Sequence, residues 1–176
     1  MGKAQSLDTI LDVAKELKLE SKIQFVFVGA GTETDRLKQR AIHESIENIV
    51  FIPRLPMSEV GGVLDYADVL LVHLKRDPLF EITVPSKTQA YMAIGKPLLM
   101  AVSGDAADLV QKAQCGRIAR SEDVDNIKTA ILEIYHLPTD GQHQLGLNAK
   151  QFYDEKLSLS YGTQQFIEIF KRVKDA

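Results

Sequence analysis

The hydrophobic positions of the first 120 residues alternate between two periods. Short runs of β-branched and aromatic residues predict buried strands, and apolar residues three and four positions apart predict helices. The predicted strands cover residues 23–28, 49–52, 68–73, 98–102 and 117–119. The predicted helices cover residues 7–17, 34–44, 58–67, 86–94 and 106–114. This alternation is typical of parallel βαβ units, so we predict an α/β fold built on a doubly wound parallel sheet.

The pattern changes character from Val124 onward. Helical spacing continues over residues 124–137, 141–157 and 161–173, with no convincing strand between these stretches. No linker composition divides them from the sheet, so we predict one domain over residues 1–176 with extra C-terminal helices.

Three helix boundaries carry local signals. Ser6 is positioned to cap the first helix with its side-chain oxygen. The run Ser86-Lys87-Thr88-Gln89 has the spacing of a capping box. Gly95 is predicted to end that helix in the left-handed conformation, because Pro97 blocks its continuation.

Composition and charge narrow the function classes. The chain has 176 residues, 45% hydrophobic and 26% charged, with a formal net charge of -3. This gives no basic field for a nucleic-acid backbone, so we expect no nucleic-acid partner. The lone Cys115 fits a reducing compartment, and neither a signal peptide nor a membrane span is evident, so we expect a cytoplasmic protein.

A glycine-rich turn, Gly29-Ala30-Gly31, follows the first predicted strand. Such a turn lets a phosphate approach the backbone. The third glycine of a dinucleotide fingerprint would fall at Thr34, however, and no acidic residue closes the next strand in the way a ribose contact requires. We therefore interpret Gly29 as part of a plain turn that borders a ligand.

The segment after residue 73 concentrates charge at the start of a helix. It holds the cations Lys75 and Arg76 and the carboxylate Glu81 before the helix that opens at Pro85-Ser86. Free N–H groups in the first turn of a helix carry partial positive charge, which suits a diphosphate. The alternative is that the helix merely starts here and the charges are solvated.

The run from Pro85 to Leu99 resembles the donor site of family-four retaining glycosyltransferases, which often read P-S-K-x-x-E-Y-M-A-x-G-K-P-V-I. The resemblance extends, in order and spacing, over residues 26–31, 49–53, 66–71, 116–118 and 145–149. It implies the Rossmann-like C-terminal lobe of a GT-B enzyme, the lobe that binds the nucleotide sugar. The donor site would then include Lys75, Val84, Pro85, Ser86 and Lys87.

Two more binding residues follow from the resemblance. Lys3 matches a loop whose lysine reaches the donor diphosphate, although a frayed chain end is the alternative. Arg54 matches the loop that borders the nucleotide base, where a guanidinium can lie against a uracil ring; the alternative is a surface arginine.

The chain departs from the family at its paired glutamates. Their positions correspond to Ile82 and Ala90, and neither is acidic. In the family the second glutamate binds the ribose hydroxyls, and the first holds the donor near its sugar or diphosphate. Glu81 lies one position from the first site, so we assign it as the candidate catalytic carboxylate, and ribose recognition becomes an open question.

The histidines indicate no metal site, because His43, His136 and His143 have no partners at ligand spacing. We predict no metal and no cofactor, only a donor substrate. His73, which ends a strand beside the predicted cleft, is the histidine that merits a test.

The family places a central strand before the loop that contains Lys3, and this sequence does not include it. Either the sheet closes without that strand, another molecule fills the gap, or the sequence is a closely trimmed piece. Losing a central strand costs packing on both faces of the sheet. We also expect the N-terminal acceptor lobe to be absent. A homo-oligomer is a further partner that the missing strand suggests.

The resemblance implies transfer of a hexosyl or acetamidosugar unit from a nucleotide diphosphate sugar, by preference a UDP-sugar, to a glycan or lipid-linked acceptor. Surface-polysaccharide assembly at the cytoplasmic membrane face, with peripheral membrane association of the full protein, is the expected setting. This lobe alone should be inactive. The alternatives are a noncatalytic nucleotide or interaction module and a lobe of a UDP-sugar 2-epimerase.

Overall fold

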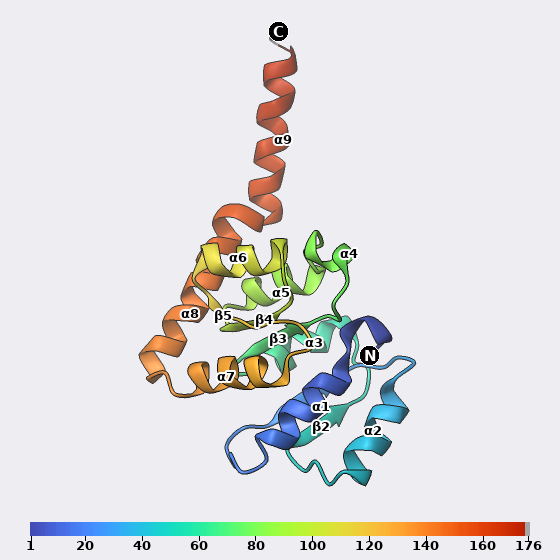
Figure 1. Cartoon of the computed structure of the whole chain (residues 1–176). Coiled ribbons are helices and arrows are strands. Elements are labelled where there is room, and N and C mark those ends of the chain that lie inside the picture. The colour runs from blue at the N-terminus through green and yellow to red at the C-terminus, as the bar shows by residue number, and fades with distance from the viewer. Residues whose placement is uncertain (175–176) are drawn as a thin grey trace.

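The chain folds as alternating strands and helices (Figure 1), and the computed structural model describes residues 1–174. The strands are β1 Phe25–Val28, β2 Ile49–Ile52, β3 Leu70–His73, β4 Leu98–Ala101 and β5 Gly116–Ile118. The helices are α1 Leu7–Glu16, α2 Thr34–His43, α3 Met57–Asp65, α4 Pro78–Glu81, α5 Ser86–Ile94, α6 Asp105–Ala113, α7 Val124–Tyr135, α8 Thr139–Phe152 and α9 Leu159–Lys174. A 3-10 turn, η1 Lys3–Gln5, precedes α1, and a π-helical turn, η2 Tyr153–Leu157, follows α8.

All strand pairings are parallel, as predicted. β1 pairs with β2, and β4 lies between β3 and β5. The two groups form separate sheets, so β1 and β3 each keep one edge without a strand partner within the described residues. Of the three alternatives for the missing strand, closure of the sheet without it is therefore the one that the described residues do not show.

β4 separates two hydrophobic clusters. Successive side chains of a strand point to opposite faces. Leu99 and Ala101 accordingly join the cluster formed with α1, α2, β1 and α7, whereas Leu98 and Met100 join the cluster formed with α5, α6 and α8. Every residue of β4 is buried, as expected for the central strand of a sheet covered on both faces.

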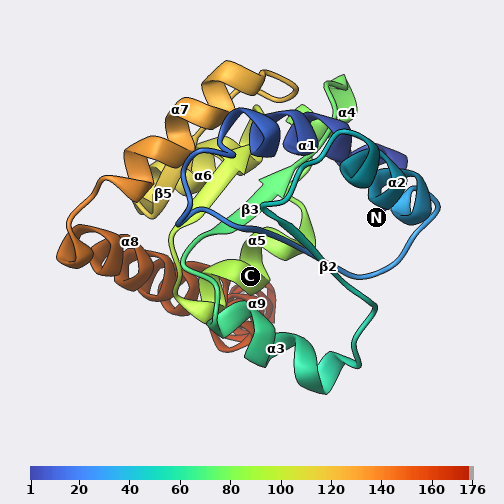
Figure 2. The ribbon, with the colours of Figure 1, turned by 90° about the horizontal axis from the view of Figure 1, so that it is seen from below.

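The helices cover both faces of the three-stranded sheet. In Figure 1, α5 and α6 lie above this sheet and α7 lies below it, beside α1. Seen from below in Figure 2, α7, α1 and α2 follow one another along one side. This is the doubly wound arrangement that the sequence predicts.

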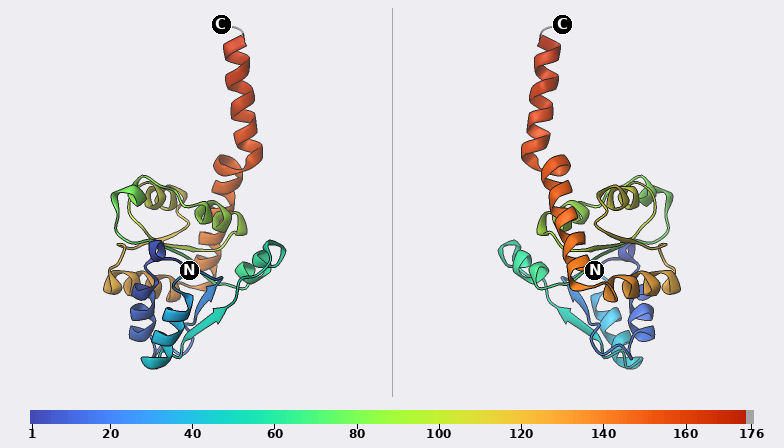
Figure 3. Two further views of the ribbon diagram at one scale, coloured as in Figure 1. Left: turned by 90° about the vertical axis from the view of Figure 1, so that its right-hand side faces the viewer. Right: turned by 90° about the vertical axis from the view of Figure 1, so that its left-hand side faces the viewer.

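Two helices extend away from this body, α3 and α9 (Figure 3). No residue of either is buried. α9 nevertheless has an apolar stripe at helical spacing, made of Leu159, Phe166, Ile169, Phe170 and Val173. The predicted C-terminal helices are present, but α9 covers no sheet.

Neither of the two predicted side-chain caps forms. The Ser6 hydroxyl donates to the Glu122 carboxylate at 2.6 Å and does not cap α1. The capping box at Ser86 is also wrong, because Ser86 is the first helical residue and Pro85 stands in the cap position. Gly95 ends α5 at φ 79° as predicted.

Within residues 1–174, no helix has the length and apolarity that a membrane crossing requires.

Candidate functional site

Loops at the carboxyl ends of three strands carry several of the predicted site residues. Gly29 follows β1, Arg54 follows β2, and Lys75 follows β3. Ligands of doubly wound sheets bind outside these strand ends. The fold therefore provides the edge on which the predicted site depends.

The N-terminal turn η1 lies between the loops that follow β1 and β3. The Met1 amino group donates to the Ala30 carbonyl oxygen at 2.6 Å, and the Lys75 amide donates to the Ala4 carbonyl oxygen at 2.9 Å. The backbone on both sides of Lys3 is therefore fixed. The exposed Lys3 side chain starts from a turn whose backbone is hydrogen-bonded to that of Lys75. The structure thus brings together Lys3, Lys75 and the turn after Gly29.

The turn after β1 requires glycine at two positions. Gly29 has φ 126°, a backbone conformation that other residues rarely adopt, and its amide donates to the Ile52 carbonyl oxygen at 3.0 Å. A Cβ at Gly31 would overlap the backbone of Met1. The missing side chain of Gly31 lets the N-terminal turn approach the end of β1 closely.

The loop after β3 contains a short helix that the pattern of hydrophobic positions did not predict. Asp77 caps α4 by accepting from the Leu79 amide at 3.1 Å, and Pro78 occupies the first helical position. This amide and the Lys75 ammonium, 3.2 Å away, lower the pKa of the Asp77 carboxyl group. Lys75 thus already has a carboxylate partner.

Glu81, the candidate catalytic carboxylate, ends α4 with an exposed side chain. Within residues 1–174 it has no ion-pair partner. Its backbone packs against the loop after β4, where Gly104 has φ 78° and a Cβ would overlap the Glu81 carbonyl oxygen. No hydrogen bond or ion pair links Glu81 to Lys3 or Arg54 in the described residues, so the structure places it on the same loop as Lys75 without joining it to the other binding residues.

The start of α5 is uncapped and positively charged. Pro85 precedes the helix, and in the described chain the Ser86 and Lys87 amides have no protein acceptor. The Thr88 hydroxyl is buried and also lacks a partner. Val84 is half-buried and leads into this turn. The unused Ser86 and Lys87 amide hydrogens, together with the helix dipole, suit an anion.

Lys87 adds a full charge to this helix start. Desolvation by the surrounding protein lowers the pKa of its ammonium group, although the side chain remains accessible to solvent. No carboxylate of residues 1–174 lies within ion-pair distance. A partly desolvated cation without a counter-ion is stabilised by binding an anion.

Arg54 is exposed in the loop after β2, and it makes no side-chain hydrogen bond or ion pair with the described residues. Nothing in the structure joins it to Lys3 or to the start of α5. Its assignment to the nucleotide base therefore stays a prediction.

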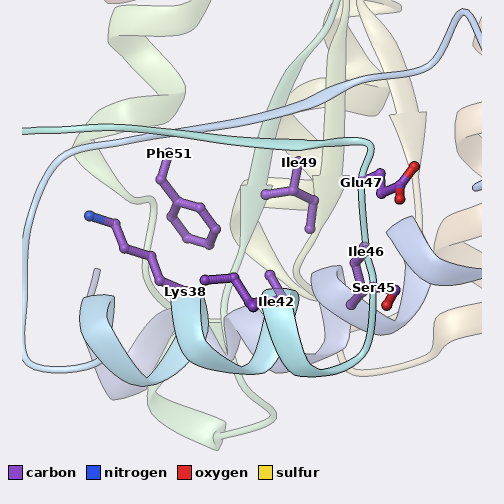
Figure 4. A pocket seen from close by; sticks show the side chains of 8 residues that line it. Lys38, Ile42, Ser45, Ile46, Glu47, Ile49 and Phe51 are labelled. Carbon is purple, nitrogen blue, oxygen red and sulfur yellow. The ribbon is translucent and has the colours of Figure 1, made fainter.

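Two surface pockets lie away from the predicted site residues. The one drawn in Figure 4 lies between α2 and β2, where Phe51 and Ile49 point toward Lys38 and Ile42. A second lies beside β5, α6 and α8. Neither contains a predicted site residue.

Sequence reasoning missed three residues that shape the site: Asp77, Thr88 and Glu122. The Asp77-Pro78 pair is a helix-start signal that identifies the first of them. Glu122 lies 46 residues from its partner Arg76, so no local pattern reveals it. Among the described residues, no cluster of three or more His, Cys, Asp or Glu side chains is arranged to hold a metal ion.

The sequence model of the family described as "Glycosyl transferases group 1" matches residues 1–152. The chain is 34% identical over 99 residues to the probable glycosyltransferase WbjE of Pseudomonas aeruginosa, a match that covers 56% of this chain and 24% of WbjE. The chain therefore spans about a quarter of the length of this relative.

Two solved structures have a similar fold. Sucrose-phosphate synthase from Thermosynechococcus elongatus superposes with a TM-score of 0.81 at 15% identity, covering 99% of this chain and 43% of that one. Anabaena Alr3699/HepE in complex with UDP gives a TM-score of 0.81 at 15% identity, covering 97% and 46%. Both likenesses concern the fold alone.

Proposed function

This chain belongs to the group 1 glycosyl transferases, and on that premise we propose that it is a lobe that binds the nucleotide-sugar donor, a UDP-sugar by preference, of a GT-B enzyme. The enzyme transfers the sugar to a glycan or lipid-linked acceptor. The family match over residues 1–152 supports the transferase assignment. We assign binding of the acceptor to a second lobe, since this chain spans less than half of the matched structures.

One observation carries this proposal: the uncapped start of α5 with its unpaired lysine. The Ser86 and Lys87 amides, the Lys87 ammonium and the Thr88 hydroxyl share one helical turn. The starts of α1, α2, α3, α6 and α8 also lack a side-chain cap, so the unpaired Lys87 ammonium is what sets the start of α5 apart. The α5 start has the chemistry that binds a diphosphate.

This lobe contributes to the reaction by stabilising the leaving group. As the bond between the sugar and the diphosphate breaks, negative charge develops on the diphosphate oxygens. Fixed amides at the start of α5 and the Lys87 ammonium offset this charge, and we assign Lys3 to the same diphosphate. No proton transfer from this lobe is required, and Glu81 holds the sugar or the diphosphate in place.

UDP is the preferred nucleotide because Alr3699/HepE, whose fold this chain shares, was solved with UDP. Arg54, exposed after β2, is the residue we assign to the uracil base. Titration calorimetry of this chain with UDP, GDP and ADP tests the proposal. We expect binding in the millimolar range or tighter, with UDP bound best; absence of binding to all three contradicts it.

A second candidate function is a noncatalytic nucleotide-binding module, and Ala90 is the observation that favours it. Ala90 is exposed on α5, where the resemblance expects the carboxylate that binds ribose. Comparing UDP with 2′-deoxy-UDP distinguishes the two functions. A clear loss of affinity for the deoxy nucleotide supports a donor site that recognises ribose, and equal affinities favour the module.

A further inference from the structure

His73 ends β3 as a buried histidine, 3% exposed, that the transfer chemistry above does not use. Its ring contacts two segments that are distant in sequence. Nδ1 lies 2.7 Å from the Gln5 carbonyl oxygen, and Nε2 lies 3.1 Å from the Glu122 amide nitrogen. One side chain thus joins the N-terminal turn to the loop before α7.

These two contacts fix the protonation of the ring. The Glu122 amide can only donate, so Nε2 must accept and carries no proton. The Gln5 carbonyl can only accept, so Nδ1 carries the proton and donates it. Burial also lowers the pKa of His73, against the raising effects of the Gln5 carbonyl and of the Glu122 charge. The neutral Nδ1–H tautomer is the form that fits.

The Glu122 carboxylate joins Ser6 to the loop after β3. One carboxylate oxygen accepts from the Ser6 hydroxyl at 2.6 Å, and the other accepts from the Arg76 amide at 2.8 Å. These two donors hold the pKa of Glu122 below its usual value, so it stays ionised. Its φ of 56° is a strained conformation for a residue other than glycine. The loop is therefore shaped to present both the amide to His73 and the carboxylate to its partners.

Further bonds close the network around the loop after β3. The Arg76 guanidinium donates to the Ser121 carbonyl oxygen at 2.8 Å, and the Ser121 hydroxyl donates to the Leu74 carbonyl oxygen. Ser121 is 4% exposed, so this part of the network is inside the protein. We call the set His73, Gln5, Ser6, Glu122 and Arg76 the His73 clamp.

We propose that His73 is a positioning residue: through the His73 clamp it fixes the turn that carries Lys3 against the loop that carries Lys75 and Arg76. This inference rests on the proposed function, since Lys3 and Lys75 are both assigned to the donor site. The reason is geometric. The turn and the loop share one direct backbone bond, from the Lys75 amide to the Ala4 carbonyl oxygen, and the clamp supplies the remaining links.

Substitution of His73 separates positioning from folding. His73→Leu keeps a buried side chain but removes both ring bonds. His73→Asn keeps a donor for the Gln5 carbonyl, and His73→Gln keeps an acceptor for the Glu122 amide. His43→Leu is the matched control, because His43 is exposed and makes no side-chain hydrogen bond with the described residues.

The readouts are UDP affinity by calorimetry and hydrogen exchange of the Lys75 and Arg76 amides, whose acceptors belong to the connected segments. We expect His73→Leu to weaken UDP binding by about tenfold, the effect of roughly 1.4 kcal/mol, and to speed exchange at both amides. His73→Asn and His73→Gln should each restore part of the affinity. His43→Leu should change neither readout.

Three results overturn the inference. If the wild type binds UDP and folded His73→Leu binds it within twofold, the positioning role fails while the proposed function stands. If the wild type binds no UDP, the proposed function fails and this inference fails with it. If His73→Leu does not fold, Glu122→Gln replaces it, and unchanged UDP affinity and exchange in that variant contradict the clamp.

Discussion

Two groups of cations in this molecule differ in their partners. Between α1 and α2, Arg36 and Arg40 form ion pairs with Asp8, and Arg40 also contacts Asp12 and Glu44. These arginines hold two helices together. The cations of the candidate site, by contrast, include Lys3, Arg54 and Lys87, which lie within ion-pair distance of no carboxylate in residues 1–174.

The difference teaches how charge is used in each region. Carboxylates on both sides of Arg40 satisfy its donors, so that its charge contributes to packing. Lys87 is partly desolvated and has no such partner, so it is placed at a cost that an anionic ligand offsets. Lys75 is intermediate, because Asp77 already neutralises it.

The largest expected effect comes from removing the unpaired charge. Lys87→Met should weaken UDP binding by about 10- to 100-fold, because a hydrogen bond to a charged group contributes roughly 1.5–3 kcal/mol. Thermal stability should not fall, since the substitution removes a desolvated charge without a partner. Calorimetry and thermal unfolding measure the two quantities. Unchanged UDP affinity would show that Lys87 is an ordinary surface lysine.

Removing a paired cation should have the opposite result. Arg40→Met deletes contacts with three carboxylates, and we expect the free energy of unfolding to fall by about 1 kcal/mol, since exposed pairs contribute little individually. The corresponding drop in Tm is about 2–4 °C for a chain of this size. UDP affinity should not change. A loss of UDP binding in the folded variant would mean that the α1–α2 arginines also serve the site.

Acid should disrupt the two regions in different pH ranges. The pKa of His73 lies below its ordinary value of 6.5 in the folded state, so its contribution to stability is present above about pH 6.5 and is lost as pH falls. Glu122 is the charged group of the clamp that acts on the His73 ring. Hydrogen bonds from Arg40 and then Lys15 lower the pKa of Glu44 to about 2, so its contribution is lost only between about pH 4.5 and pH 2.

Urea unfolding at a series of pH values separates these contributions. Between pH 7.5 and 5.5, the free energy of unfolding should fall less in His73→Leu than in the wild type. Below pH 4.5, the free energy of unfolding should fall less in Arg40→Met than in the wild type. Identical pH profiles for all three proteins would contradict both assignments.

The smallest expected effect comes from converting a paired cation into an unpaired one. Asp77→Asn keeps a residue able to cap α4 but releases Lys75 from its carboxylate. We expect UDP affinity to rise by about two- to fivefold, because an exposed ion pair competes only weakly with a charged ligand. The same calorimetric titration measures it. A decrease would show that the ion pair orders the loop for binding.

Much of the fold follows from local pattern. Buried strands such as β4 are continuous apolar runs, and helices such as α7 show an apolar face at 3.6-residue spacing, so both are predictable from neighbouring residues. The split into two sheets is different. The split arises because no strand lies between β1 and β3 in the described residues. A local pattern predicts each strand but does not show which strands pair with one another.

The candidate site divides in the same way. The segment from Lys75 to Lys87 is recognisable, because its charges and its helix start are consecutive in sequence. The pairing of Ser6 with Glu122 spans 116 residues, so the hydroxyl that looks like a local cap serves a distant loop instead. His73 is conspicuous as the last residue of a strand, but its two partners become known only when the chain is folded.

The central claim is that the unpaired Lys87 and the uncapped amides at the start of α5 bind the diphosphate of a nucleotide. The most direct test is to titrate the chain with UDP and with uridine under the same conditions by calorimetry. The account predicts that UDP binds at least about tenfold more tightly than uridine, because the diphosphate supplies the charge-assisted bonds. Equal affinity for the two compounds, or binding of neither, would contradict it.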